Sequence, residues 1–524
     1  MSATDQRPNF LFIITDQQRA DWLGCAGHPV VRTPHIDALA SRGTRFERFY
    51  VASPVCMPNR ASLMTGRFPT THGLRYNGCF LPATANTFVD VLKADGYRTA
   101  SIGKSHLQPF TTVPPVARAP FDSGPIEEAW QKDGHDYWQE QPTRYDGTSR
   151  YDFRTPYYGF DHVDMVVGHS DQVDGHYLQW LRAQTPDWDR LRDRNHQLPH
   201  NYSCPQAYRT AIPEELYPTA YVRDRACEWL KAQQDADQPF FAFVSFPDPH
   251  HPFTPPGRYW DMYDPDEFRV PLPYSRHQNP PMPMRACMEL AQAGRDPITP
   301  TTAFSLLDER QIREAMALSA GMISMVDDAI GDLTRTLTEA GLTENTVICF
   351  NSDHGEYMGD YNLMLKGALS TEGINRVPFI WVEPGQEQTA VSHAMGSTVD
   401  ISSTVLARAG SKPYFGMQGE NLLPCLQGAD SERDAVLVEF NDAVPRMGFK
   451  TPARVRTLVT PDVRFSIYKD EPWGELYDRE VDPEDTHNRF DDPAKRSQRA
   501  DLALELNHRL IGLMDESPRS ERLA

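Results

Sequence analysis

Residues 9–16 (Asn-Phe-Leu-Phe-Ile-Ile-Thr-Asp) decide the fold class. A short, unbroken apolar run is typical of a strand that is buried on both faces, and this one ends at an acid, Asp16. Residues 35–42 follow with the signals of a short helix: a possible threonine cap, a proline in the first turn and a glycine just after the end. The chain therefore opens with a strand that delivers a carboxylate, followed by a helix.

The same alternation continues along most of the chain. Strands are expected at residues 44–51, 97–102, 240–246, 346–351 and 377–382, and helices at residues 87–95, 213–234, 308–340 and 400–409. Alternating strands and helices indicate an α/β fold, with a mostly parallel sheet sandwiched by helices. The proline-rich residues 271–300 are expected to form a loop. The aperiodic residues 108–161 are expected to form an excursion over the core, either a wall of the substrate pocket or a plain surface insertion.

The pattern changes near residue 430. Short strands without intervening helices are expected at residues 436–440, 455–460 and 464–468, followed by a helix at residues 499–514. We therefore expect a catalytic domain at residues 1–430, with an insertion at 108–210, and a smaller α+β domain at residues 431–524.

Composition excludes several partners. The 524 residues include 52 Lys and Arg against 72 Asp and Glu, and the resulting net charge of −20 disfavours nucleic acid and anionic membranes. An anionic substrate would need a local cluster of cations. No apolar run approaches a membrane span, no signal peptide is recognised, and the eight cysteines form no C-x-x-C pair. These features predict a reduced, cytoplasmic protein.

Polar residues follow several of the predicted strands, namely Asp16, Lys104, His250, Asp353 and His354. Ligands bind outside the carboxyl ends of strands in open α/β sheets, so these side chains are expected to converge. Carboxylates suit calcium, magnesium or manganese, and an imidazole beside them moves the choice towards manganese. Taken alone, an Asp-His pair is equally consistent with a turn capped by the aspartate.

Residues 56–67 (Cys-Met-Pro-Asn-Arg-Ala-Ser-Leu-Met-Thr-Gly-Arg) form the strongest single motif. Pro58 suits the first turn of a helix, which places Cys56 just before that helix's N-terminus. Free backbone N–H groups there favour an anion, and Arg60 adds a planar donor for oxyanions. A structural cysteine before a helix is the alternative.

This motif resembles the C-x-P-x-R sequence of the type I sulfatases, which belong to the alkaline phosphatase superfamily. Other family-like elements follow in order: residues 9–21, 33–43, 103–106, 249–252, 352–355, 366, 376–378 and 474–483. The resemblance implies an alkaline-phosphatase-like fold and a formylglycine made from Cys56 by a formylglycine-generating enzyme. It also implies one divalent metal ion, calcium first and manganese second. Its expected ligands are Asp16, Cys56, Asp353 and His354.

The resemblance also assigns roles to the remaining site residues. Arg60, Lys104 and Lys366 would offset charge on the sulfate oxygens. His250 would protonate the leaving alcohol. His106 would accept the proton of the second formylglycine hydroxyl, whose loss releases sulfate. The implied substrate is a small-molecule sulfate ester, with aryl esters favoured by aromatic residues in the variable segments. A homo-oligomer, with the polar C-terminal stretch as an arm, is the expected assembly.

One position departs from the pattern, because Gln17 stands where many sulfatases carry a second aspartate. Gln17, His354 and Asn77 instead resemble the phosphonate monoester hydrolases of the same superfamily, and Gln17 and Asn77 are expected to bind substrate. Lys104 and His106 follow the sulfatase pattern. A sulfatase is therefore favoured, with a phosphonate or phosphodiester hydrolase as the alternative and a non-catalytic binding protein as a third reading. The other histidines, His169 among them, are expected to be structural.

Overall fold

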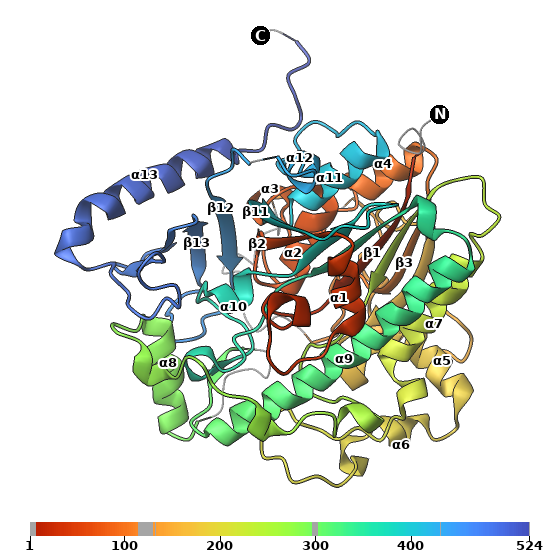
Figure 1. Ribbon diagram of the computed structural model, residues 1–524, viewed down its shortest axis with the longest axis horizontal. Helices are drawn as coiled ribbons and strands as arrows, with labels where there is room; N and C mark the ends of the chain where they lie inside the picture. Colours follow the sequence, from red (N-terminus) through yellow and green to blue (C-terminus); the bar gives the residue numbers. More distant parts are fainter. Residues whose placement is uncertain (1–6, 114–128, 132, 296–301, 430, 523–524) are drawn as a thin grey trace.

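A nine-stranded mixed sheet forms the centre of the molecule (Figure 1). The structure is a computed structural model that describes residues 7–113, 129–131, 133–295, 302–429 and 431–522. The strands lie in the order β11-β2-β10-β8-β1-β6-β3-β4-β5. Their bounds are β1 Asn9–Thr15, β2 Thr44–Tyr50, β3 Arg98–Lys104, β4 His162–Val167, β5 Asp174–Gly175, β6 Phe240–Ser245, β8 Thr346–Ser352, β10 Phe379–Val382 and β11 Ala390–Ser397.

The central part of this sheet is parallel. Strands β8, β1, β6, β3 and β4 all run the same way, whereas β10 and β5 are antiparallel to their neighbours. The strand ends are in register, since Thr15 lies beside Ser352 and Ile14 beside Ser245. Every residue of β1 is buried, as the unbroken apolar run predicts. The carboxyl ends of β8, β1, β6 and β3 therefore open onto one edge.

Helices cover both faces of the sheet (Figure 1). Leu11 and Ile13 of β1 pack with α1, α7 and α9 on one face, and Phe10 and Phe12 pack with α2, α4 and α11 on the other. The helices are α1 Pro34–Ser41, α2 Cys56–Thr65, α3 Pro69–His72, α4 Phe88–Ala94, α5 His176–Gln184, α6 Trp188–Arg192, α7 Pro218–Lys231, α8 Met282–Gln292, α9 Glu309–Glu339, α10 Glu372–Asn375, α11 Asp400–Ala409, α12 Leu423–Leu426 and α13 Arg496–Gly512. The predicted sandwich is confirmed.

A smaller antiparallel sheet, in the order β12-β13-β14-β15, lies beside the large one. Its strands are β12 Val436–Asn441, β13 Arg454–Val459, β14 Val463–Tyr468 and β15 Gly474–Asp478, and β7 Phe304–Ser305 pairs separately with β9 Leu363–Met364. Helix α13 packs on the small sheet through Leu506. Val436 and Val438 join the hydrophobic cluster of the large sheet, so the two parts share a core. A domain boundary near residue 430 remains our proposal.

Two segments differ from expectation. The prediction of a loop over residues 271–300 is wrong, because α8 occupies its middle; residues 296–300 lie outside the described part. Pro283 sits in the first turn of α8, where a proline costs no hydrogen bond, and Met284, Cys287 and Met288 are buried. The segment 108–210, expected to be an insertion, also contributes to the core after residue 161, because β4 joins the large sheet and α5 packs against it. Residues 114–128 and 132 of this segment lie outside the described part.

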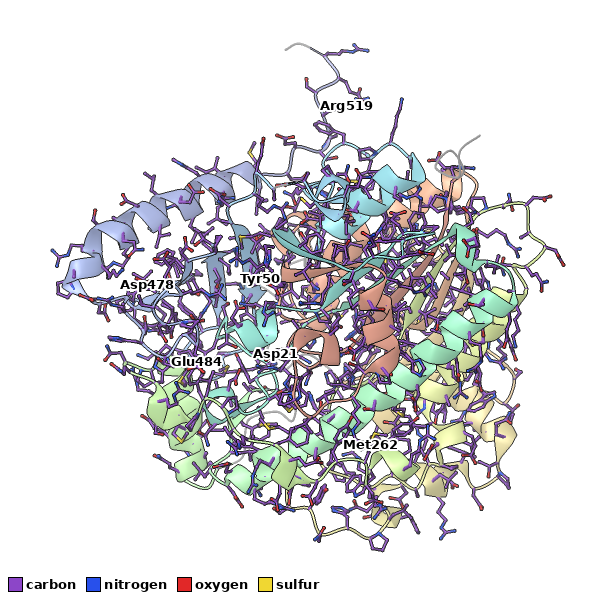
Figure 2. All side chains as sticks on the ribbon, in the orientation of Figure 1. Asp21, Tyr50, Met262, Asp478, Glu484 and Arg519 are labelled. Atoms are coloured by element: carbon purple, nitrogen blue, oxygen red, sulfur yellow. The ribbon has the colours of Figure 1, made fainter. Side chains whose placement is uncertain are left out.

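The C-terminal segment runs away from the body of the molecule. Figure 2 shows Arg519 on this projecting stretch, beyond the end of α13. Among the described helices, none combines the length and the apolar character that crossing a membrane would require.

Candidate active site

The loops that follow β1, β3, β6 and β8 bring the predicted polar residues together. Asp16, Lys104, Asp353 and His354 are completely buried, and His250 is nearly so. The backbone N–H of Asp353 donates to the carbonyl oxygen of Thr15 at 3.0 Å, which ties the ends of β8 and β1 together. The convergence follows from the register of the parallel strands.

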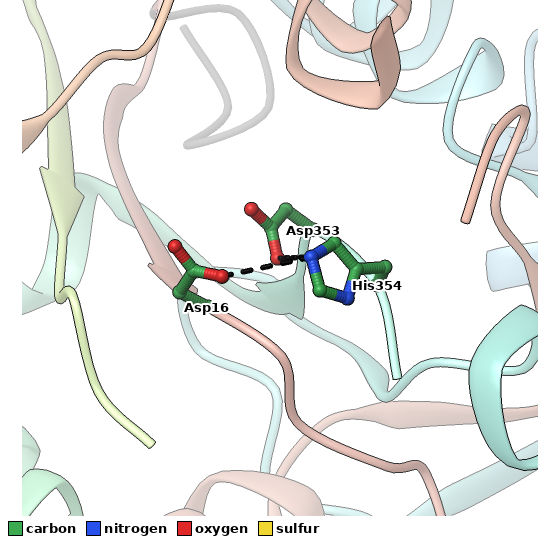
Figure 3. A group of neighbouring side chains, drawn as sticks. All are labelled: Asp16, Asp353 and His354. Carbon is green, nitrogen blue, oxygen red and sulfur yellow. Dashed lines mark ion pairs between the residues drawn. The ribbon is translucent and has the colours of Figure 1, made fainter. Parts of the chain in front are cut away.

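Asp16, Asp353 and His354 form a compact group of three possible metal ligands (Figure 3). His354 Nε2 lies 3.7 Å from Asp16 Oδ1 and 3.7 Å from Asp353 Oδ1. His354 Nδ1 lies 2.8 Å from the Gly355 carbonyl oxygen and must donate to it. In the neutral imidazole, Nε2 therefore presents a lone pair to two carboxylates.

This arrangement fits a divalent cation. Asp16 Oδ1 and His354 Nε2 are buried atoms with no hydrogen-bond partner, and they face each other. Two carboxylates and a neutral imidazole lone pair repel one another unless a positive charge lies between them. A cation held by Asp16, Asp353 and His354 would supply that charge.

Cys56 begins helix α2 beside this group. The helix includes Cys56 as its first residue, so it begins one residue earlier than the sequence indicates, and it ends before the left-handed Gly66. Asn77 Nδ2 donates to Cys56 Sγ at 3.4 Å, and the Met57 N–H donates to Asn77 Oδ1 at 3.3 Å. Asn77 therefore connects the sulfur to the N-terminus of the helix, where an anion is favoured.

Two cations surround the carboxylates. Arg60 Nε donates to Asp353 Oδ2 at 2.7 Å, and a second Arg60 nitrogen donates to the Lys104 carbonyl oxygen at 2.8 Å. The Lys104 ammonium donates to Asp16. The residue before Lys104 must be glycine, because the φ of Gly103 is 107° and a Cβ there would lie 1.9 Å from the Ser245 carbonyl oxygen of β6. The expected local positive charge is therefore present despite the net charge of −20.

These charges shift the pKa values of the site. Burial alone would raise the pKa of Asp16, but Lys104 and Arg60 outweigh it and hold that pKa well below its usual value. Burial would likewise raise the pKa of the Cys56 thiol. The positive charge of Lys104, with a smaller effect from that of Lys366, instead lowers it to about 7. The pocket thus favours an anion at position 56.

A second group that contains a cation is centred on Lys366. Lys366 Nζ lies 2.7 Å from His250 Nε2 and donates to Gln17 Oε1 at 2.5 Å. Gln17 Nε2 donates to the buried carboxylate of Glu356 and lies 3.1 Å from His251 Nδ1. Both ends of the Gln17 amide are therefore engaged within the protein, and Gln17 connects Lys366 to Glu356.

His106 sits on a loop held by an unpredicted residue, Glu140. The Glu140 carboxylate accepts the N–H groups of His106, Leu107 and Gln108 at 2.8, 2.9 and 3.0 Å. The His106 ring stacks on Phe110 with centroids 3.9 Å apart, and its Nδ1 is buried without a hydrogen-bond partner.

His169, expected to be structural, also reaches the site, because its ring stacks on that of His250 with centroids 3.6 Å apart. The structure thus brings all predicted site residues into one cluster: Asp16, Gln17, Cys56, Arg60, Asn77, Lys104, His106, His250, Asp353, His354 and Lys366. Glu140, His169 and Glu356 were missed. Only Glu356 lies near a motif, two residues after His354; no local pattern marks the other two.

Comparison with known proteins identifies relatives. The family model described as Sulfatase matches residues 8–411, and one described as N-sulphoglucosamine sulphohydrolase, C-terminal, matches residues 359–512. The chain is 29% identical to an ulvan-active sulfatase of Formosa agariphila (97% of this chain, 82% of the relative). It is 30% identical to an arylsulfatase of Clostridium perfringens (72% and 69%). The crystal structure of a phosphonate monoester hydrolase of Agrobacterium radiobacter superposes with a TM-score of 0.78 at 25% identity, covering 99% of this chain and 98% of that one.

Proposed function

The chain belongs to the sulfatase family of sulfuric ester hydrolases, and on that premise we propose that it hydrolyses small-molecule sulfate monoesters, aryl sulfates first among them. The observation that carries the proposal is the position of Cys56. Its sulfur lies at the start of α2, bound by Asn77, between two groups of cations.

The proposed nucleophile is formylglycine made from Cys56 by a formylglycine-generating enzyme. The Cys56 thiol stands where the two hydroxyls of the hydrated aldehyde would lie. One hydroxyl gives up its proton to water and attacks sulfur, and the bond between sulfur and the leaving oxygen breaks. The second hydroxyl then loses its proton, the aldehyde re-forms and sulfate departs. His106 is the proposed acceptor of that proton, since its Nδ1 is buried without a partner.

Charge and proton supply come from different side chains of the site. Arg60 and Lys104 offset charge on the sulfate oxygens, and Lys366 stands beside the departing oxygen. His250 Nδ1 lies 2.5 Å from the His251 carbonyl oxygen and must donate to it, so Nε2 accepts from Lys366. The proton for the leaving oxygen therefore comes from the Lys366–His250 pair, rather than from His250 alone.

Calcium is the proposed metal, with manganese as the alternative. When bound by Asp16, Asp353, His354 and modified Cys56, a divalent ion would supply positive charge and acidify the attacking hydroxyl. After chelation, calcium is expected to raise the melting temperature of the protein at lower concentration than manganese. The Asp353→Asn variant should lose this shift, and a stronger shift with manganese would contradict calcium.

The first experiment compares kcat/KM for an aryl sulfate and the matched aryl phosphonate monoester. The protein is co-expressed with a formylglycine-generating enzyme, and conversion at position 56 is measured by peptide mass spectrometry. We expect a large preference for the sulfate, and we expect Cys56→Ala to abolish turnover without changing the melting temperature. Substantial activity in Cys56→Ala would refute the formylglycine mechanism.

A phosphonate monoester or phosphodiester hydrolase is the second candidate, favoured by the superposition on the Agrobacterium radiobacter enzyme. Gln17, Asn77 and His354 support it as well. A higher kcat/KM for the phosphonate in the same experiment would establish this alternative. An unmodified thiol at Cys56 in the native host would instead favour a non-catalytic binding protein.

A homo-oligomer is proposed through helix α13. Leu504 and Ile511 are exposed by 57% and 71%, and their spacing of seven places them on one face of α13; Met514, exposed by 70%, follows just after the helix. Helix α13 is followed by the projecting segment that carries Arg519 (Figure 2). A second copy of the chain is the proposed occupant. Light scattering should give a multiple of the 59.5 kDa chain mass, and Ile511→Glu should reduce it. A monomeric wild type would refute the proposal.

A cytoplasmic location is proposed from cysteine chemistry. All eight cysteines fall in the described part of the chain, and none forms a disulfide. Buried free thiols persist in reducing compartments. Fractionation of native cells should recover the protein with cytoplasmic markers, and recovery with secreted proteins would contradict this.

A further inference from the structure

His169 stacks on the proton-donating side of the site. It follows β4 and Gly168, and its ring lies at 16° to that of His250 with centroids 3.6 Å apart. The His250 ring in turn lies 4.0 Å from the ring of His251 at 27°. Three nearly parallel imidazoles therefore form one stack, with His250 in the middle.

A second contact of a different kind joins the same two loops. Ser170, the next residue, places its hydroxyl within hydrogen-bond reach of the carbonyl oxygens of His250 and Pro252. Ser170 is completely buried and has a φ of 48°. The loop after β4 thus contacts both the His250 ring and the backbone of the His250 loop. The stacking of His169 on His250 is therefore supported by a second contact between the same two loops.

The stack restricts how the His250 ring can turn. One edge of the ring is fixed by the hydrogen bond from Nδ1 to the His251 carbonyl oxygen, and the other edge faces Lys366. His169 covers one face of the ring. Without it, the space beside His250 would admit water and allow the ring to tilt away from Lys366.

We propose that His169 is a positioning residue that holds His250 in place for proton transfer to the leaving group. The inference rests on the proposed function. When the bond between sulfur and the leaving oxygen breaks, its electron pair stays on that oxygen, which takes one proton from the Lys366–His250 pair. A basic leaving oxygen needs this proton, whereas a stabilised phenolate needs it far less. The contribution of His169 must therefore grow with the basicity of the leaving group.

The test compares two variants over a series of substrates. His169→Ala removes the stacking ring, and His169→Phe keeps an aromatic ring without nitrogen. The values of kcat/KM are measured with 4-nitrophenyl, phenyl and simple alkyl sulfates. Melting temperature and formylglycine content are checked in each variant, so that loss of folding or of maturation is recognised.

For His169→Ala, we expect a loss that is smallest with 4-nitrophenyl sulfate and larger by about tenfold or more with the poorer leaving groups, within the range of general acid catalysis. His169→Phe should recover most of this loss. An equal loss on every substrate, or a phenylalanine variant no better than the alanine variant, would overturn the positioning role. Failure of the proposed function is distinguishable, because the wild type itself would then hydrolyse none of the sulfates.

Discussion

At the scale of single residues, Glu140 shows how a distant carboxylate can fix a catalytic loop. It is completely buried, and its oxygens accept three consecutive N–H groups from residues 106–108 and the Tyr157 hydroxyl. This loop turns at His106, whose φ is 59°. No neutral side chain of the same size offers so many acceptors, so the position of the His106 ring depends on the two oxygens of the Glu140 carboxylate.

Glu140→Gln is therefore expected to lower both kcat and stability. The amide leaves one oxygen for four donors, and each buried donor left without an acceptor costs roughly 1–3 kcal/mol. The free energy of unfolding is measured in urea, and kcat with an aryl sulfate. Tyr157→Phe is the matched control, because it removes only the hydroxyl donor and should leave kcat close to that of the wild type. An unchanged kcat in a destabilised Glu140→Gln would show that Glu140 acts on stability alone.

At the scale of elements, two leucines of α13 lie on different faces of the helix and differ in burial. Leu506 is completely buried against the small sheet, whereas Leu504 is 57% exposed. Leu506→Ala is expected to cost about 2–5 kcal/mol, as is usual for a buried leucine. Leu504→Ala should cost less than about 0.5 kcal/mol in the monomeric Ile511→Glu background. Urea denaturation of both variants measures the difference, and similar costs would contradict the packing of α13.

Elements were predictable where the local pattern and the fold agree. The apolar run at residues 9–16 predicted β1, and the helix expected at residues 308–340 matches α9 to within one residue at each end. Helix α13 begins and ends within three residues of its predicted bounds. Strand β4 was missed because Asp164 interrupts its apolar run. In the fold, that carboxylate is bound by Arg150 at 2.6 Å and by the Tyr221 hydroxyl at 3.1 Å, partners that only the tertiary structure supplies.

At the scale of the whole molecule, the site was predictable because parallel strands end at a common edge. Asp16, Lys104, His250 and Asp353 each follow an apolar strand, and this rule alone brings them together. Glu140 and His169 could not be found in this way. They come from a segment with weak periodicity, and their contacts join residues 34 and 81 positions apart, which no local pattern encodes.

The buried histidines outside the active site also set how the whole molecule responds to acid. The Nδ1 atoms of His72 and His176 accept the backbone N–H groups of Leu74 and Met165 at 3.2 and 3.0 Å, so protonation would break these hydrogen bonds. Burial lowers the pKa of His72 to about 3 and that of His176 to about 4. Both side chains therefore stay neutral in the folded protein at pH values where the unfolded chain binds protons.

Stability is accordingly expected to fall as the pH drops below about 6.5, the pKa of an unfolded histidine. The contribution of each histidine is fully present above that pH and decreases by about 1.4 kcal/mol per pH unit down to its folded pKa. Urea midpoints between pH 7.5 and pH 4.5 measure the slope. The double variant His72→Asn and His176→Asn keeps an acceptor oxygen but cannot titrate, so its slope should be shallower than that of the wild type. His508→Asn, at an exposed position, should leave the slope unchanged. Equal slopes in the wild type and the double variant would show that the acid response arises from other titratable groups.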